Sequence, residues 1–493
     1  MQRFDPNPDR GHWSWPSVGL WPAVLLGVAL FLLSGCALVG PDYVTPELVL
    51  PDAWQAVSPQ VPSANGARLA RWWQTLDDPV LSGLIRQAMA DNLDVKDALS
   101  RVRETRLQRL IARSALFPGL DASGSAKLSG DDSSDTTELY STGFDAAWEL
   151  DLFGGIHRSV EAAQADINAE VEALGDVRVT LLAEVAANYI DLRTYQARLG
   201  VATRNVASME ETWSLLDALA RAGMGDELAV AQARYNLESS RAGIADLEVG
   251  LAEAMHRLAV LTGQPAGSLN AELARVRPIP QASVELAVGV PADLLRQRPD
   301  IRQAERQLAA QTARIGEAEA QLYPSFTLNG SIGLEALSLG DLFAAESRIW
   351  SIGPGFSWSI FNAGSIRNQI KVQEEQQQQA LINYKSTVLG ALEEVENALV
   401  ALDREQRKQA RLEAAAKAAS QAADLAQQQY TTGMTGFSDV LDAQRSQLSF
   451  EDQLVESRGA ILSDLVHLYK VLGGGWQSPD DATEPNPGSV HKG

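Results

Sequence analysis

The sequence predicts a mainly helical, internally duplicated protein whose four β-strands belong to a membrane-spanning sheet. Three observations lead to this prediction. Four short stretches alternate apolar with small polar residues, one helical stretch of about 65 residues contains no proline, and several motifs recur at a fixed spacing. Strands of about 9–11 residues with one apolar and one polar face have the length and pattern that cross a bilayer in a barrel.

The strand pattern is clearest at Trp350–Phe361, where large apolar residues alternate with serine and glycine. Leu120–Leu128, Tyr140–Leu150 and Phe326–Leu334 alternate in the same way. Aromatic side chains recur on the apolar side of these stretches and are predicted to face lipid, namely Tyr140, Phe144, Trp148, Phe326, Trp350, Phe356 and Trp358. An ordinary sheet of two hairpins packed on helices has the same alternation, so the strands alone leave both interpretations open.

The N-terminus has the pattern of a lipoprotein signal peptide. Trp21–Leu33 is apolar but too short to span a bilayer as a helix, and Leu33-Ser34-Gly35-Cys36 follows as a lipobox. We therefore expect residues 1–35 to be the signal peptide and the Cys36 thiol to carry the lipid, although a buried structural cysteine is the alternative. Alanine rather than aspartate at position 37 favours sorting to the outer membrane.

Composition argues against several other classes of protein. The net charge of −22 does not suit nucleic-acid binding, which needs a basic surface to neutralise phosphates. Cys36 is the only cysteine, the five histidines lack metal-ligand spacing, and no phosphate-binding loop or nucleophile motif occurs. We expect no enzymatic activity, no catalytic residues, no metal and no cofactor other than covalent lipid on Cys36.

Helical periodicity and breaker residues divide the rest of the chain into two repeats. A proline-rich tether is predicted at 36–76, a linker or equatorial region at 264–291 and a tail at 474–493. The first repeat, 77–263, contains a helix, a strand pair at 117–153, a long helix at 156–222 and a return helix at 227–262. The second repeat, 292–473, contains a helix, a strand pair at 324–361, a long helix at 364–432 and a return helix at 436–472.

The register of the repeats is set by matching motifs. Phe117-Pro118 precedes Tyr323-Pro324 by 206 residues, whereas Trp148 precedes Trp358 by 210. The same spacing of 210 separates the two Gly-Met pairs, which begin at Gly223 and Gly433. Two halves that keep one register over most of the chain indicate a structural duplication.

Four strands are too few to close a membrane barrel, because about eight is the smallest number and an open strand edge in lipid is costly. The barrel must therefore be shared between copies of the chain. Two copies would supply eight strands and three would supply twelve. The long helices, each about 100 Å in length, would then line a tunnel below an outer-membrane pore.

Five motifs, in order, resemble those of the outer-membrane factor family of TolC-like channels. The most distinctive is Leu294–Ile301, LLRQRPDI, followed by Ala304-Glu305; the others are Val39–Tyr43, Trp72-Trp73, Tyr323-Pro324-Ser325 and Leu472–Trp476. They resemble in particular the NodT-type lipoprotein branch that serves RND efflux pumps. The resemblance implies a homotrimer with a twelve-strand barrel and a periplasmic α-helical barrel, which docks with a periplasmic adaptor (membrane fusion) protein and an inner-membrane RND-type transporter.

The resemblance also places the family's periplasmic gate on residues 438–445. Asp442 matches the constricting aspartate and Arg445 a basic residue that holds the coils shut, with Ser438 and Asp439 as further candidates. Salt bridges between coils would give a weak, switchable closure. The alternative is that Asp442 and Arg445 only solvate one helix face at spacing i,i+3. Weaker candidates for the tunnel lining or the adaptor contact lie at the two turns, where simple chain reversal also explains the glycines, namely Gly223, Met224, Asp226, Glu227, Gly433 and Met434.

The function predicted from the sequence is a passive exit duct of a tripartite efflux complex, conducting small molecules to the exterior. The duct of a type I protein secretion system and a lipid-tethered coiled-coil scaffold without a pore remain as alternatives. We expect the protein in the outer membrane, anchored in its lipid and spanning it with several strands, with a large periplasmic part.

Overall fold

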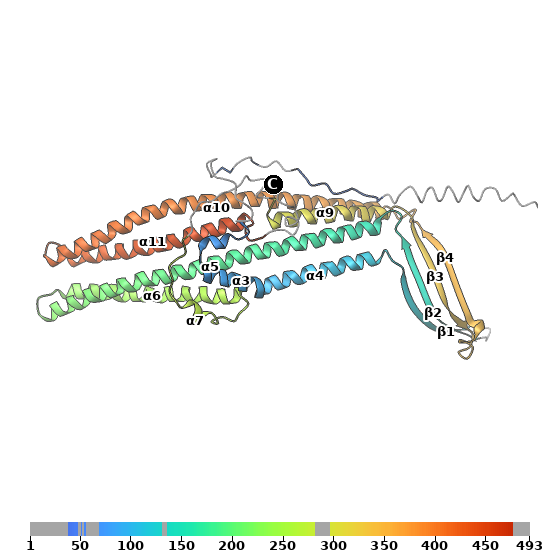
Figure 1. Ribbon diagram of the computed structural model, residues 1–493, viewed down its shortest axis with the longest axis horizontal. Coiled ribbons are helices and arrows are strands. Elements are labelled where there is room, and N and C mark those ends of the chain that lie inside the picture. Colours follow the sequence, from blue (N-terminus) through green and yellow to red (C-terminus); the bar gives the residue numbers. More distant parts are fainter. Residues whose placement is uncertain are drawn as a thin grey trace, which may run out of the picture. The chain divides into compact units, whose positions relative to one another are not determined.

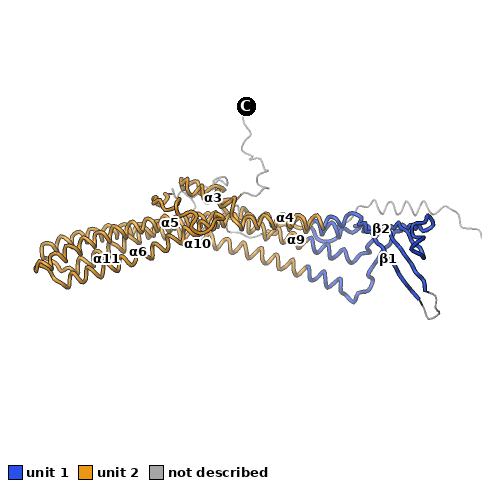
Figure 2. The backbone as a smooth tube through the Cα atoms, turned by 90° about the horizontal axis from the view of Figure 1, so that it is seen from below, with its two compact units in different colours: residues 1–42, 112–160, 313–373 blue, residues 43–111, 161–312, 374–493 orange. Residues whose placement is uncertain are grey.

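The computed structural model describes residues 38–47, 51, 54–55, 69–130, 136–281 and 296–476. The predicted signal peptide, Cys36, Leu294-Leu295 and residues 477–493 of the predicted tail lie outside these residues. The chain forms two compact units (Figure 2). Unit 1 comprises the described parts of 1–42, 112–160 and 313–373, and unit 2 comprises the described parts of 43–111, 161–312 and 374–493.

Helices make up most of the described chain (Figure 1). In order they are η1 (Trp72–Leu76), α3 (Pro79–Asp91), α4 (Leu93–Ser114), α5 (Gly155–Arg221), α6 (Glu227–Leu261), α7 (Asn270–Leu273), α9 (Pro299–Ala320), η2 (Ala345–Ser347), α10 (Ser365–Thr431) and α11 (Phe437–Val471). Helices α5 and α10 have 67 residues each, and α6 and α11 have 35 each. The duplication seen in the motifs therefore extends to the lengths of the helices.

The helix expected between residues 77 and 116 is two helices, because Asn92 interrupts it. The Asn92 side-chain oxygen accepts hydrogen bonds from the backbone N–H groups of Asp94 and Val95, at 2.8 and 3.1 Å, and so caps α4. Its amide nitrogen donates to the Leu261 carbonyl at 3.1 Å, at the end of α6. The apolar periodicity continues across the break, which is why the sequence predicted one helix.

Equivalent helices end in the same way in the two repeats. Gly223 and Gly433 have φ of 72° and 73°, and in each case the N–H of the following methionine donates to a carbonyl five residues back, at 2.9 Å. This is the Schellman arrangement, which needs a left-handed residue. A Cβ added at either glycine would meet nothing within 4 Å. Glycine is therefore required there for its backbone conformation and not for space.

Unit 1 contains the four predicted strands in one antiparallel sheet with the order β1-β2-β3-β4. The strands are β1 (Gly119–Gly130), β2 (Thr136–Leu150), β3 (Ser325–Ala336) and β4 (Arg348–Ser357). The predicted strand Trp350–Phe361 was too long, because β4 ends at Ser357. Ser357 pairs with Ser325, the first residue of β3, and the preceding Pro324 has no N–H to extend the ladder.

The register sorts the side chains of the sheet onto two faces of opposite character. Phe144 pairs with Ile332, and Ile332 pairs with Trp350, so the apolar residues of three strands share one face. On the other face hydroxyl groups bridge the strands, as between Ser125 and Ser141 at 2.9 Å. A similar bridge joins Ser331 and Ser351 at 2.8 Å. Within the described chain β1 and β4 each have one unpaired edge.

Two of the sequence motifs meet in the core of unit 2. Trp72 is buried and stacks on Tyr469, with ring centroids 5.1 Å apart. A Cβ on Gly474 would lie 2.9 Å from the Trp72 ring, so the glycine permits this close packing. The tryptophan pair near the start of the chain and the glycine run near its end therefore form one packed junction.

A third motif, the Arg-Pro-Asp block, ties together three helices of unit 2. The Arg298 guanidinium, which is buried, donates to the Val471 carbonyl at the end of α11 at 2.7 Å. It also donates to the carboxylates of Asp300 in α9 and Glu394 in α10, each at 2.7 Å. These charged hydrogen bonds satisfy a helix-end carbonyl and compensate the burial of the arginine.

Candidate functional site at the helical hairpin tips

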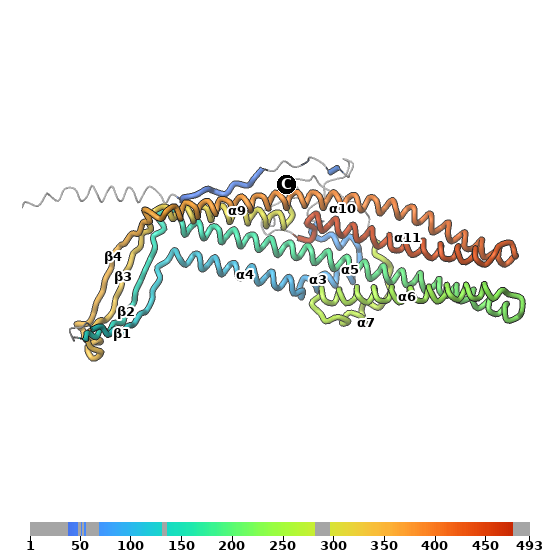
Figure 3. Tube along the Cα trace, turned by 180° about the vertical axis from the view of Figure 1, so that it is seen from behind, coloured from blue at the N-terminus to red at the C-terminus, as the bar shows by residue number. Residues whose placement is uncertain are grey.

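Unit 2 ends in two helical hairpins that lie side by side. One is α5–α6 and the other is α10–α11, and their turns lie at the same end of the unit (Figures 1 and 3). A buried apolar cluster joins them near the turns, with members Leu216, Ala229, Ala233, Phe437, Val440 and Leu441. Residues of α6 and α11 pack directly in this cluster, and Tyr430 adds its ring 5.3 Å from that of Phe437. The predicted gate residues lie on the turns of α11 beside it.

Arg445 connects the two hairpins. Its Nε donates to Asn236 Oδ1 at 2.9 Å and its Nη2 donates to the Tyr235 hydroxyl at 2.7 Å. The guanidinium carbon also lies 5.5 Å from the centroid of the Tyr235 ring, within the range of a cation–π contact. Arg445 therefore does more than solvate a helix face, because it bonds α11 to α6.

Sequence reasoning missed Tyr235 and Asn236, yet a signal for them existed. Tyr235 precedes Arg445 by 210 residues, the same spacing that relates the two repeats. Equivalent surfaces of the repeats face each other, so the offset itself identifies the partner position. Asn236 is 5 % exposed, and its Nδ2 lacks a hydrogen-bond partner among the described residues.

Asp442 makes a weaker contact. Its carboxylate lies 3.6 Å from Arg445 Nη1 on the same helix, and both side chains are exposed. Exposed ion pairs of this kind contribute about 0–1 kcal/mol to stability. Asp439, in the first turn of α11, accepts a hydrogen bond from the Thr435 hydroxyl, and Ser438 is exposed. Asp442 is thus accessible to solvent or to another chain, as a constricting carboxylate would be.

The candidates at the first turn have local structural roles. Asp226 caps α6 by accepting the Leu228 N–H at 2.9 Å, and Glu227 adds negative charge in the first turn of that helix. Met224 and Met434, by contrast, are 75 % and 72 % exposed at the two turns. The exposed methionines give the two equivalent tips an adaptable apolar surface.

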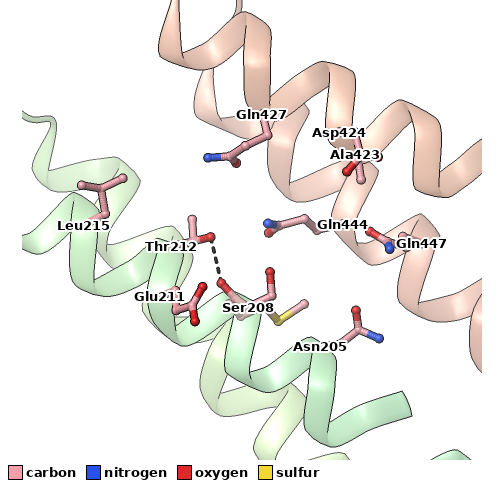
Figure 4. A pocket seen from close by; sticks show the side chains of 11 residues that line it. Asn205, Ser208, Glu211, Thr212, Leu215, Ala423, Asp424, Gln427, Gln444 and Gln447 are labelled. Carbon is pink, nitrogen blue, oxygen red and sulfur yellow. Dashed lines mark hydrogen bonds between the residues drawn. The ribbon is translucent and has the colours of Figure 1, made fainter.

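A polar cavity of about 320 Å³ lies between α5 and the α10–α11 hairpin (Figure 4). Figure 4 shows Gln444 reaching from α11 toward Ser208 and Thr212 of α5. The Oε1 atom of Gln427 is buried there without a hydrogen-bond partner among the described residues. The hairpins are therefore joined by an apolar cluster and by Arg445, while a polar cavity remains between α5 and the α10–α11 hairpin.

The aromatic residues predicted to face lipid all lie on the apolar side of the sheet or just beyond it. Trp350 and Phe356 are 76 % and 72 % exposed in the single chain, and Phe144 is also exposed. Trp148 and Trp358 donate their indole N–H groups to the carbonyls of Leu116 and Leu322, each at 3.0 Å. Tyr140 and Phe326 are half-buried. An exposed apolar face of this size needs another surface or lipid to cover it.

Two features are absent from the residues that the structure describes. None of the described helices contains a stretch that is both long and apolar enough to cross a bilayer. In the same residues no three histidine, cysteine, aspartate or glutamate side chains gather as a metal ion would need.

Comparison with known proteins gives the family. A sequence profile described as "Outer membrane efflux protein" matches residues 84–264 and 290–474. The chain belongs to the outer membrane efflux protein family. The profile matches each repeat once, and the two matched ranges have the offsets of 206 and 210 residues seen in the motifs.

Individual proteins of known name are similar over nearly the whole chain. Nodulation protein T of Rhizobium leguminosarum bv. trifolii is 35 % identical over 446 residues, covering 90 % of this chain and 94 % of that protein. The cation efflux system protein CusC of Escherichia coli O6:H1 is 32 % identical over 463 residues, covering 92 % and 99 %. The structure of the outer-membrane channel OprN has a TM-score of 0.82 at 35 % identity and covers 90 % of this chain and 100 % of that one.

These findings confirm the predicted family, fold class and place in the cell. The protein is an outer-membrane efflux channel of the TolC-like type, with a helical part in the periplasm and strands that contribute to a β-barrel. Its relatives are efflux channels and not enzymes. The roles of Cys36, of the gate residues and of the turn residues stay predictions.

Proposed function

We propose that this protein is the homotrimeric exit duct of a tripartite efflux complex and passes small molecules from a periplasmic adaptor and an inner-membrane RND-type pump to the exterior. The observation that supports this most directly concerns β1 and β4, which each have one edge without a partner among the described residues, in a sheet with one apolar and one hydroxyl-rich face. In lipid these edges need partners. Pairing of β1 in one copy with β4 in the next satisfies them, and three copies supply twelve strands.

Helices α4 and α10 carry surfaces suited to the same association between copies. Helix α4 exposes Leu107, Leu110 and Ile111 beside the arginines Arg101, Arg103, Arg106 and Arg113. Helix α10 exposes Ile382 and Leu389 beside the acidic residues Glu374, Glu375 and Glu393. Packing α4 of one copy against α10 of the next would bury apolar surface and bring opposite charges together.

In this proposal the gate is closed by polar contacts and not by a ring of apolar side chains. Arg445 holds α11 to Asn236 and Tyr235 of α6, and Asp442 stands exposed beside it. Three Asp442 carboxylates brought toward a common axis would repel one another and exclude anions from the bore. Hydrogen bonds and exposed ion pairs are weak enough for a docking partner to replace.

The remaining parts of the proposal concern partners and energy. The adaptor docks on the hairpin tips, where Met224 and Met434 are exposed. The duct hydrolyses nothing and carries no cofactor besides lipid on Cys36, so the energy for transport comes from the proton-driven pump.

Mass and conductance measurements test the duct directly. The purified chain in detergent should have the mass of three copies by light scattering, and should open single channels in planar bilayers. Ile111→Glu, which places a charge on the exposed face of α4, should shift the mass toward one copy, whereas Glu104→Gln on the same helix should not. A detergent-free monomer without conductance would show a scaffold instead.

Loss of a secreted protein, with normal drug export, in a strain lacking the gene would point to type I secretion.

A further inference from the structure

The first described residues, 38–42, form a strap that lies on unit 1 against the start of α5. The Val39 N–H donates to the Phe153 carbonyl at 3.2 Å. A Cβ on Gly154 would lie 3.1 Å from Leu38, so this glycine lets the strap approach the backbone closely. The sequence predicted residues 36–76 as an extended tether, but this part of it is seated on the folded protein.

Arg158 provides most of the polar contacts of the strap. Its Nε donates to the Val39 carbonyl at 3.0 Å, and its Nη2 donates to the Gly40 carbonyl at 3.2 Å and to an Asp42 carboxylate oxygen at 2.8 Å. The residue is only 3 % exposed. A buried guanidinium is costly unless acceptors surround it, and here the strap supplies three of them.

Two glycines complete the seat, which is the surface of unit 1 on which the strap lies. Gly40 has a left-handed φ of 91°, and a Cβ on it would collide with the backbone of Gly316 in α9. A Cβ on Gly316 would lie 2.7 Å from the Val39 carbonyl oxygen and 2.9 Å from the Arg158 side chain. The fit of backbone against backbone, together with the buried arginine, defines one position for the strap.

We propose that Arg158 is a positioning residue for the lipid anchor, because it fixes the strap on the strand-bearing unit two residues after Cys36. Two residues of extended chain span at most about 7 Å, so a seated Leu38 holds the site of acylation close to the strand–helix junction at residues 151–155. The lipid is then attached within a short distance of unit 1 and not at the end of a loose tether. This inference rests on the proposed lipidation of Cys36.

Hydrogen exchange on the purified, lipidated, full-length protein tests the seat. In Arg158→Ala the amides of 39–42 other than Pro41, above all that of Val39, which donates to the Phe153 carbonyl, should exchange on the order of tenfold faster or more, because the strap loses the charged hydrogen bonds that hold it in place. Asp42→Asn, which leaves the guanidinium in place, should give a smaller rise. The matched control is Arg198→Ala. Arg198 lies on the same helix as Arg158, but it binds Asp452 and not the strap. Unchanged exchange at 39–42 in Arg158→Ala would overturn the proposal.

Exchange in α11 reports whether a variant still folds. If Arg158→Ala does not fold, Gly40→Ala decides with the same readout, because its added methyl group unseats the strap while the arginine remains. Faster exchange at 39–42 then supports the seat, and unchanged exchange rejects it.

A second readout separates positioning from local packing. Cells fed a photoactivatable palmitate analogue would carry it on Cys36, and illumination would cross-link it to nearby residues. In the parent protein the cross-links should gather on the lipid-facing residues of unit 1 nearest to residues 151–157, whereas in Arg158→Ala they should spread over the lipid-facing residues of all four strands. The same distribution in both proteins would reject the positioning role. Absence of label on Cys36 would refute lipidation and with it this inference, while the trimer and conductance tests of the duct would stand unaffected.

Discussion

Arg445 and Tyr235 occupy equivalent positions of the two repeats, 210 residues apart, and the arginine donates to the tyrosine hydroxyl at 2.7 Å. The duplication therefore produces more than two similar hairpins, because equivalent faces of α6 and α11 meet. The two members of the pair have diverged into a donor and an acceptor. A contact between diverged equivalents is specific, and it is also weak enough to be broken without disturbing the apolar cluster beside it.

Removing Arg445 should loosen the hairpins and widen the channel. Arg445→Ala, alone or with Asp442→Ala, should raise single-channel conductance in planar bilayers, because α11 loses its hydrogen bonds to α6. Asp442→Ala alone should have a smaller effect on the hairpin contact, since its carboxylate lies 3.6 Å from Arg445. Arg407→Ala, which removes an exposed arginine paired within α10, is the matched control. Unchanged conductance in the double variant would remove both residues from the gate.

A substitution at Asn236 should have the opposite effect and hold the hairpins together more tightly. Asn236→Asp would give Arg445 a carboxylate in place of an amide oxygen. It would also remove Nδ2, which has no hydrogen-bond partner among the described residues. A charge-assisted bond should strengthen the lock by about 1 kcal/mol, which is about a fivefold lower open probability. Recordings of open time at neutral pH measure this. An open probability that rises would show that the burial of the new charge outweighs the added bond.

The sequence predicted those features that depend on periodicity and on glycine and proline residues that end helices and strands. Alternation located the four strands, and the recurrence of Trp148 as Trp358 gave the duplication. The break at Asn92 was not predicted, because one side chain makes it by capping α4 and bonding the end of α6. Such contacts between distant segments leave no periodic signal.

The candidate site was predictable only in part for the same reason. Arg445 and Asp442 came from a resemblance, and the structure adds Tyr235 and Asn236 from the other hairpin. The contact of Arg158 with the strap joins positions more than a hundred residues apart and depends on two carbonyl groups, whose position no side-chain pattern reveals.

Trp148 and Trp358 should contribute equally to stability in the two repeats. Each indole N–H donates at 3.0 Å to a carbonyl just after a helix end, Leu116 after α4 and Leu322 after α9. Replacing either tryptophan by phenylalanine should therefore cost about 1 kcal/mol of unfolding free energy. Trp350→Phe, on the same face and 76 % exposed, is the control. Thermal unfolding in detergent would contradict the assignment if all three variants behaved alike.

The turn glycines should respond to alanine in the opposite sense from a glycine inside a helix. Gly433→Ala should destabilise the protein by about 1 kcal/mol, because its φ of 73° is strained for any residue with a Cβ. Gly243→Ala, in the middle of α6, should stabilise it by about 0.5–1 kcal/mol. An added Cβ meets nothing within 4 Å at either site, so the comparison isolates backbone conformation. Loss of stability in both variants would indicate contacts made in the assembled channel.

Asp176 should make the stability of unit 2 depend on pH. Burial raises the pKa of its carboxyl above the ordinary value of 3.8, and repulsion from Asp300 adds to this against the attraction of Lys470 and Arg298. A raised pKa means that the folded chain binds the proton more tightly than the unfolded chain does. Stability from this group is therefore greatest below pH 3.8 and falls as the pH rises through the folded-state pKa.

Asp176→Asn, which mimics the neutral carboxyl, should therefore raise the melting temperature at pH 7. The gain should shrink as the pH is lowered and vanish below about pH 3.8, where the parent aspartate is itself protonated. Glu253→Gln, at an exposed position of α6, should change the melting temperature little at any pH. A lower melting temperature for Asp176→Asn at pH 7 would mean that the attraction of Lys470 and Arg298 for the carboxylate exceeds the cost of burying it.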